Sequence, residues 1–167
     1  MAAITAAEAG SQNIVRFLDL IAHSEGTSSH PLTQHDGYDV IVSSVHGPAI
    51  FDDFSDHPFA HGRAPQLVRR EPELLSTASG RYQLLLRFWR DYRVSLALTD
   101  FSPISQDHIA IQQIREKHAI EEIMFGQIET AISLCSKIWA SLPGNQYGQG
   151  GKSMEELLDW WSEHQTV

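Results

Sequence analysis

The sequence predicts an α+β fold, with a small β lobe at about residues 36–56 and a larger helical body formed by residues 13–25 and 66–164. Three observations lead to this prediction. Apolar side chains recur at helical spacing before the lobe, short β-branched runs surround Gly47, and helical periodicity returns after an irregular loop. We expect one domain spanning residues 1–167, because 167 residues can bury a core of their own. A cleft between the two lobes is the expected site.

The first helix is predicted at residues 13–25, where Ile14, Phe17, Leu18 and Ile21 lie 3, 4 and 7 residues apart on one face. Asn13 is the expected N-cap, and Gly26 is the expected residue after the last turn. The preceding residues contain Glu8 and have no basic region. They are therefore expected to form a short frayed tail and not a secretion signal.

The β lobe is predicted as one hairpin. Tyr38–Val42 and Ile50–Phe54 are short β-branched or aromatic runs, and Gly47 and Pro48 lie between them. Residues 55–66 are expected to form a loop.

From Gln66 onward the chain is expected to be helical. One helix is predicted at residues 81–97, and another opens at Pro103, because proline favours the first turn. A third covers residues 127–140. A capping box of Ser153 and Glu156 predicts the start of the last helix.

Composition and charge exclude several classes of protein. The net charge of −9 argues against a nucleic-acid binder, which needs clustered Lys and Arg. No apolar run approaches the ~20 residues that cross a bilayer. The single cysteine, Cys135, cannot form an internal disulfide, so we expect synthesis in a reducing cytoplasm and a plain core role for this residue.

The charge is unevenly distributed. Residues 63–99 hold seven Arg and three acidic residues, whereas residues 1–62 hold eight acidic residues and only Arg16. This basic segment is either a solvated face that balances the acidic ends or a patch that meets an anionic polymer.

Glu25 is the strongest candidate for chemistry. It lies four residues after Ile21, so it continues the apolar stripe of the first helix. Burial and the negative end of the helix dipole would both raise the pKa of its carboxyl. A carboxyl that keeps its proton near neutral pH can act as a general acid toward a glycosidic oxygen. By spacing alone, a helix-end carboxylate that bends out to water is the preferred reading.

The same region holds candidates for a second carboxylate and for metal ligands. Glycosidases commonly pair two carboxyl groups, and the candidates here are Asp36, Asp39, Asp52, Asp53 and Asp56. Their spacing singles out none of them, and turn aspartates usually bond to the local backbone. Six of the nine histidines fall within residues 23–61, but no HExxH or CxxC spacing occurs, so we expect no metal and no cofactor.

Two further segments carry residues suited to sugar binding. Residues 80–85, GRYQLL, place Tyr82 and Gln83 just after a predicted helix start at Gly80. The glycine-rich loop at residues 141–151 carries Tyr147, an aromatic ring of the kind that stacks on sugars. Core packing of Tyr82 and a simple connector role for the loop are the alternatives.

Six blocks occur in the order found in one family: SEGT (24–27), HDGYDVIV (35–42), SDHP (55–58), GRYQLL (80–85), DFSPISQD (100–107) and IWASLPG…YGQ (138–149). With these blocks, the chain resembles the lambda-type phage endolysins across roughly residues 13–150. The resemblance implies a lysozyme-like fold. It also implies a lytic transglycosylase that cleaves the β-1,4 bond between N-acetylmuramic acid and N-acetylglucosamine in peptidoglycan, leaving 1,6-anhydro ends.

The resemblance also implies roles for particular residues. Glu25 would be the catalytic acid and then the base, and no second carboxylate would be needed. Gln83 and Tyr147 would bind substrate, with Tyr82 and Gln149 as weaker candidates. The implied partners are peptidoglycan glycan strands and a phage holin. The enzyme, expected to be a monomer without signal peptide or membrane segment, would stay in the host cytoplasm until the holin releases it to the wall.

Three alternatives remain open at this point. A hydrolytic muramidase would pair Glu25 with an aspartate of the β lobe. A metallopeptidase would use the His and Asp residues to cut the stem peptide. A wall-binding module would need no catalytic residue.

Overall fold

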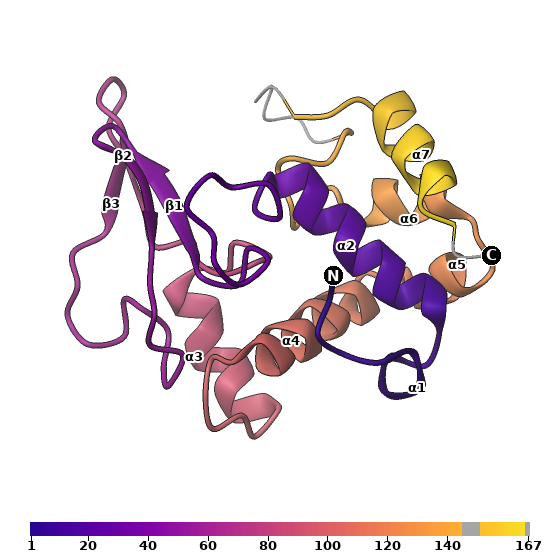
Figure 1. Ribbon diagram of the computed structural model, residues 1–167, viewed down its shortest axis with the longest axis horizontal. Helices are drawn as coiled ribbons and strands as arrows, with labels where there is room; N and C mark the ends of the chain where they lie inside the picture. Colours follow the sequence, from indigo (N-terminus) through magenta and orange to yellow (C-terminus); the bar gives the residue numbers. More distant parts are fainter. Residues whose placement is uncertain (145–150, 166–167) are drawn as a thin grey trace. The chain divides into compact units, whose positions relative to one another are not determined.

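The computed structural model describes residues 1–144 and 151–165 and has the α+β architecture predicted from the sequence (Figure 1). The chain divides into two compact units. The first comprises residues 1–25 and 110–167, and the second comprises residues 26–109. None of the helices in the described residues has the length and apolar character needed to cross a bilayer.

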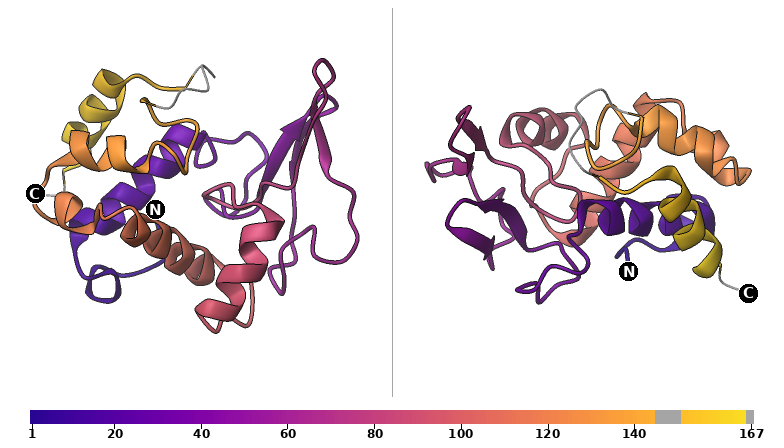
Figure 2. Two further views of the ribbon diagram at one scale, coloured as in Figure 1. Left: turned by 180° about the vertical axis from the view of Figure 1, so that it is seen from behind. Right: turned by 90° about the horizontal axis from the view of Figure 1, so that it is seen from above.

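The first unit is helical. Helix α4, Pro103–Glu116, runs across the division between the units. The other helices of this unit are α1 (Ala6–Ala9), α2 (Gln12–Glu25), α5 (Ile120–Met124), α6 (Ile128–Cys135) and α7 (Met154–Glu163). Helix α2 packs against α5 and α7, and α6 packs against both of these helices, as the two views of Figure 2 show.

The core of the first unit is formed by the apolar faces of these helices. Ile14, Phe17, Leu18 and Ile21 are all buried on α2, as their spacing predicted. Cys135 on α6 is fully buried too, which confirms its core role, and burial raises the pKa of its thiol to about 12.

Aromatic contacts join α2 to α7. The guanidinium of Arg16 lies 3.4 Å from the ring centroid of Trp161, in a cation–π contact. The ring of His23 stacks on Trp160 at 5.2 Å, and Trp160 stacks in turn on His164 at 4.0 Å. These contacts fix α7 along the part of α2 between Arg16 and His23.

The second unit contains two antiparallel hairpins and one complete helix. The hairpins are β1 (Val40–Ser44) with β2 (Gly47–Ile50), and β3 (Gln66–Arg69) with β4 (Leu74–Ser76); the helix is α3 (Leu86–Ser95). In the first hairpin Val40 pairs with Ile50 and Ile41 with Ala49. The backbone N–H of Val45 donates to the carbonyl of Leu67, which brings the two hairpins side by side (Figure 1).

The core of the second unit lies between the first hairpin and α3. Its buried members are Ile41, Phe51, Phe59, Leu84, Trp89, Phe101 and Ile109. The indole N–H of Trp89 donates to Asp56 at 2.7 Å, and Arg93 forms an ion pair of 3.0 Å with the same carboxylate. The loop that follows the first hairpin is thereby tied to α3.

Several boundary predictions are confirmed. The helix predicted at residues 13–25 occurs as α2, and Pro103 opens α4. The predicted capping box begins α7, because Ser153 accepts from the backbone of Glu156 and the Glu156 side chain accepts from the backbone of Ser153. The hairpin around Gly47 is present, but the prediction of its second strand at Ile50–Phe54 is wrong, because that strand is Gly47–Ile50.

Other predictions are wrong. The predicted helical body from Gln66 onward fails for residues 66–76, which form the second hairpin. The helix predicted at residues 81–97 begins only at Leu86. Helix α2 begins at Gln12, so Asn13 is not its N-cap.

The N-terminal tail is ordered. Residues Ala6–Ala9 form a short helix with a capping box between Thr5 and Glu8, and Ile4 is buried. A helix of one turn is too short to show the spacing of apolar side chains that predicts a helix. The expectation of a frayed tail is therefore wrong for this segment.

Candidate functional site

Glu25 is the last residue of α2, and its position follows from the apolar stripe of that helix. Ile14, Leu18 and Ile21 precede it on the buried face. Gly26 follows it with φ +73, a left-handed conformation that ends the helix. The Glu25 side chain is half-buried as a result, instead of projecting fully into solvent.

One residue from a distant part of the first unit holds the Glu25 carboxyl. The hydroxyl of Ser141 donates to Oε1 of Glu25 at 2.5 Å, and the backbone of Ser141 also donates to this carboxyl. The hydroxyl of Ser24, the neighbour of Glu25, donates to the carbonyl of Ser141 at 3.0 Å. The last two residues of α2 are therefore both bonded to Ser141.

The electrostatics of this site favour the protonated acid. Burial raises the pKa of Glu25, and the hydrogen bonds from Ser141 offset part of that rise. No charged group of the described residues is among the causes of the shift. A carboxyl with a raised pKa that is held by a hydroxyl can donate a proton and then receive one.

Gln83 belongs to the second unit and has an unusual backbone. Its φ is +52, a left-handed conformation that non-glycine residues seldom adopt. Its side-chain amide donates to the carbonyl of Gly80 at 3.0 Å, and the side chain is half-buried. Conformations of this kind occur both at functional sites and in turns. The substrate-binding role of Gln83 therefore stays a prediction.

The segment before α3 is a tight turn and not the predicted helix start. Ser79 and Leu84 exchange backbone hydrogen bonds of 3.0 and 2.9 Å, so residues 80–83 form a loop between them. Gly80 has φ +81, and a Cβ there would lie 2.2 Å from Oε1 of Gln106. The close approach lets Gln106 accept from the backbone N–H of Arg81 at 2.9 Å.

Tyr82 lies inside the second unit. It is buried, and its hydroxyl donates to Asp107 at 2.6 Å. Tyr38 donates to the same carboxylate oxygen at 2.7 Å. With its hydroxyl committed to Asp107, Tyr82 is placed to shape the turn that carries Gln83.

The prediction missed the buried polar residues that hold this turn. The guanidinium of Arg81, which is 1% exposed, donates to the backbone carbonyl of Asp36, and the hydroxyl of Thr27 donates to the carbonyl of Arg81 at 2.6 Å. Gln106 donates to the carbonyls of Tyr38 and Phe101. The sequence contained one signal of these buried polar residues. Asp107 lies four and seven residues before the apolar Ile111 and Ile114, so it shares the apolar face of their helix.

Three of the aspartates considered as a second carboxylate have hydrogen-bond partners within the second unit. Asp39 accepts from the hydroxyl of Thr33 at 2.5 Å and from the backbone of Gln34 at 2.8 Å. Asp53 accepts from the backbone of Ser55, and Asp56 accepts from Trp89 and Arg93. Asp36 has the left-handed φ of +53 within a turn, and Asp52 is exposed. Three of the five thus have structural roles.

The histidines do not assemble a metal centre in the described chain. Within residues 1–144 and 151–165, no three His, Cys, Asp or Glu side chains are grouped so that they could hold a metal ion. His57 is buried; one ring nitrogen lies 2.9 Å from the Leu84 carbonyl, and the other accepts from the backbone of Phe59. Burial lowers its pKa to about 4, so the ring is neutral near pH 7.

The predicted site residues are thus distributed over the chain. Glu25 lies in the first unit, whereas Tyr82 and Gln83 lie in the second. The other two predicted substrate-binding residues, Tyr147 and Gln149, lie outside the described residues. Ser141, which the prediction did not single out, is the partner of Glu25.

Comparisons with known proteins identify the relatives of this chain. A family model described as endolysin matches residues 15–167. The endolysin of Escherichia phage P2 is 59% identical over 151 residues, which is 90% of this chain and 91% of that protein. The endolysin of Escherichia phage lambda is 49% identical over 148 residues, which is 88% of this chain and 87% of that protein.

Solved structures show the same likeness. Bacteriophage lambda lysozyme complexed with a chitohexasaccharide superimposes with a TM-score of 0.80 at 45% identity, covering 98% of this chain and 96% of that one. A second structure of lysozyme from bacteriophage lambda gives a TM-score of 0.74 at 43% identity, with 96% and 92% coverage. At this identity and coverage the likeness extends to the sequence as well as the fold.

Proposed function

Since this chain belongs to the endolysin family, we propose that it is a peptidoglycan lytic transglycosylase. In this proposal it cleaves the β-1,4 bond between N-acetylmuramic acid and N-acetylglucosamine and leaves 1,6-anhydro-muramic acid ends. The observation that carries the proposal is the half-buried carboxyl of Glu25, whose pKa is raised by burial and whose position is held by Ser141.

The proposed reaction uses Glu25 twice. Its carboxylic acid gives a proton to the glycosidic oxygen, and the bond between this oxygen and C1 of the muramic acid breaks. The C6 hydroxyl oxygen of the same sugar then forms a bond to C1, and its proton passes to the Glu25 carboxylate. The acid is restored without water, and one group that serves as acid and then base contributes about 10²–10⁴-fold to the rate.

The remaining acceleration would come from holding the sugar in place. We assign substrate binding to Gln83 and to Tyr147, with Gln149 as a further contact. Tyr82 would act from the core by fixing the turn that carries Gln83, because its hydroxyl is bonded to Asp107. No cofactor enters these steps.

The hydrolytic alternative pairs Glu25 with an aspartate of the first hairpin region. The hydrogen bonds that Asp39, Asp53 and Asp56 make within the second unit favour the reaction without a second carboxylate. The lambda protein, whose structure holds a chitohexasaccharide, makes a glycan strand the natural ligand here as well. We further propose that the enzyme acts as a monomer and depends on a phage holin to pass from the host cytoplasm to the wall.

Mass spectrometry of digested peptidoglycan tests the reaction. Anhydro-muramic ends are expected, and reducing muramic acid ends would show a hydrolase instead. Glu25→Gln should abolish product formation while the protein stays folded, whereas Asp53→Asn, at an exposed turn carboxylate, should retain activity. Continued clearing of walls by Glu25→Gln would remove Glu25 from the mechanism.

A further inference from the structure

We propose that Ser141 is a positioning residue that orients the Glu25 carboxyl for both proton transfers and is itself held by Ser24 and packed closely against Gly151. This inference rests on the proposed function, because it assigns a role to the partner of the proposed catalytic acid. It extends that function to a serine 116 residues away along the chain.

The geometry at the Glu25 carboxyl restricts its motion. Ser141 offers two donors to one acceptor group: its hydroxyl lies 2.5 Å from Oε1 of Glu25, and its backbone bonds to the carboxyl as well. Two donors from one residue limit rotation of the carboxyl far more than a single flexible donor would. Bonds of this kind to an ionised oxygen are short and among the stronger ones in proteins.

Ser141 is itself restrained by its neighbours. Its carbonyl accepts from the hydroxyl of Ser24 at 3.0 Å. On the other side, a Cβ added at Gly151 would lie 2.3 Å from that same carbonyl oxygen, so only glycine permits the approach. The next residue, Leu142, is 1% exposed and anchors the segment in the first unit.

Two opposing effects act on the charge of the Glu25 carboxyl. Burial favours the neutral acid and Ser141 favours the carboxylate, so the two effects oppose each other at one group. The ionisable groups of the neighbouring segment, Lys152, Glu156 and His164, act on His23 instead, whose ring is stacked on Trp160. Ser141 is therefore the described residue that adjusts the acid strength of Glu25.

Loss of the Ser141 hydroxyl should change both the pKa of Glu25 and the reaction rate. Without this donor the carboxylate is less stabilised, so the pKa of Glu25 should rise further above its usual range. The acid becomes weaker and less well oriented, and the rate should fall about tenfold, the effect of losing one hydrogen bond to a charged group. The alkaline limb of the pH–rate profile should move to higher pH, because Glu25 keeps its proton longer.

The test compares Ser141→Ala with Ser141→Thr, which keeps a hydroxyl, and with Ser133→Ala. Ser133 is a matched control because its exposed hydroxyl donates to the carbonyl of Glu129 in the same unit. The carboxyl of Glu25 is titrated by carbon-13 NMR, with its resonance assigned from Glu25→Gln. Release of anhydro products is then measured against pH for each variant.

The expected result is a raised Glu25 pKa and a slower, alkaline-shifted profile in Ser141→Ala, with wild-type behaviour in the other two variants. A Glu25 titration in Ser141→Ala that matches the wild type would overturn the proposal. If the alanine variant does not fold, Ser141→Thr is compared with Ser141→Val. The two side chains have the same shape, but valine has a methyl group where threonine has the hydroxyl, so the comparison again isolates the loss of the hydroxyl. The NMR titration needs no turnover, so failure of the proposed reaction would leave this result readable.

Discussion

Tyr82 donates its hydroxyl to the buried carboxylate of Asp107 across 2.6 Å. The two residues lie 25 positions apart, one in the turn before α3 and the other in α4. Because Tyr38 shares the same acceptor oxygen, Asp107 ties two loops of the second unit to one helix. The Asp107 carboxylate therefore stabilises the turn at residues 80–83 through its hydrogen bond with Tyr82.

Asp107→Ala should lower the free energy of unfolding by about 3 kcal/mol, because two buried hydroxyls would lose their acceptor. Urea denaturation measures the loss. Asp91→Ala removes an exposed carboxylate of α3 and should change stability by no more than about 0.5 kcal/mol. Equal losses in the two variants would contradict the role given to Asp107.

The stability of the protein should depend on pH through His57. Its pKa is about 4 in the folded protein, against 6.5 for the ordinary residue. Between pH 6.5 and 4, His57 is protonated in the unfolded chain but not in the folded one. Its contribution to the free energy of unfolding is therefore fully present above pH 6.5 and is lost as the pH decreases toward 4. The contribution amounts to roughly 3 kcal/mol.

Urea denaturation of the wild type and His57→Gln between pH 7 and 4.5 measures this effect. The difference in stability between the two proteins should shrink as the pH falls, because the variant has no imidazole to protonate. His46→Gln, at an exposed position, should follow the wild type at every pH. A difference between wild type and His57→Gln that stays constant with pH would rule out this assignment.

Gly80→Ala should destabilise the second unit by about 2–5 kcal/mol. The left-handed φ of +81 alone costs about 1–2 kcal/mol for a residue with a Cβ. The new methyl group would also meet Gln106 at 2.2 Å and displace its bond to Arg81, adding about 1–3 kcal/mol.

Gly62→Ala is the matched control, because Gly62 has φ +84 in the same unit but nothing within 4 Å of the added methyl group. It should show only the backbone cost. Thermal and urea unfolding of both variants separates the two contributions. If Gly80→Ala costs no more than Gly62→Ala, the close approach of Gln106 is not important.

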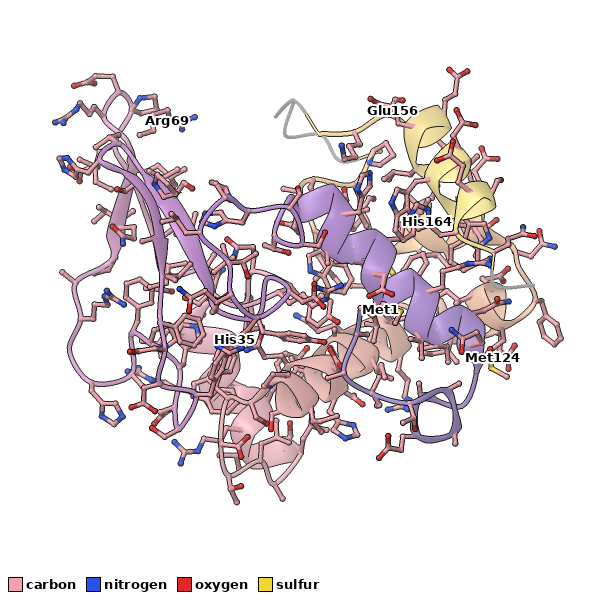
Figure 3. The ribbon with its side chains drawn as sticks, in the orientation of Figure 1. Met1, His35, Arg69, Met124, Glu156 and His164 are labelled. Atoms are coloured by element: carbon pink, nitrogen blue, oxygen red, sulfur yellow. The ribbon has the colours of Figure 1, made fainter. Side chains whose placement is uncertain are left out.

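Wall binding should weaken with salt through the arginines of the second unit. Of the seven Arg in residues 63–99, Arg81 is buried and the other six are exposed: Arg63, Arg69, Arg70, Arg87, Arg90 and Arg93. Arg69 lies at the turn of the second hairpin (Figure 3). Exposed charges of this kind attract anionic polymers, and salt screens the attraction.

Replacing Arg87 and Arg90 together by Gln, in a Glu25→Gln background that binds without cutting, should reduce sedimentation with purified walls and flatten its dependence on salt. Lys117→Gln combined with Lys137→Gln removes the same charge from the first unit and serves as the control. An unchanged salt dependence in the Arg variant would mean that these arginines are only a solvated face.

The parts of the fold that follow local rules were predictable. The 3.6-residue repeat of α2 and the reciprocal bonds of Ser153 and Glu156 need only neighbours along the chain. The position of Glu25 followed from the same repeat. The burial that raises its pKa was predictable in direction, because the preceding apolar residues show which face is covered.

The parts that depend on distant partners were not predictable. Leu67, Val68, Leu74 and Leu75 have spacings that fit a helix, yet they form a hairpin in which none of them is fully buried. Leu84 and Phe88 likewise continue a helical pattern, but Gln106 and Asp107 hold residues 80–83 in a turn. Ser141 was not recognised because nothing near it in the sequence reveals a bond to Glu25.

The division of the chain has a consequence for the order of folding during synthesis. The second unit is one continuous stretch, residues 26–109, so all its contacts can form soon after that stretch leaves the ribosome. The first unit is discontinuous, and α2 (Gln12–Glu25) packs on α5 (Ile120–Met124) and α7 (Met154–Glu163), which are made much later. Glu25 therefore leaves the ribosome before the other predicted site residues, but its partner Ser141 is made much later. A truncated translation product would contain the proposed catalytic side chain without its hydrogen bond to Ser141.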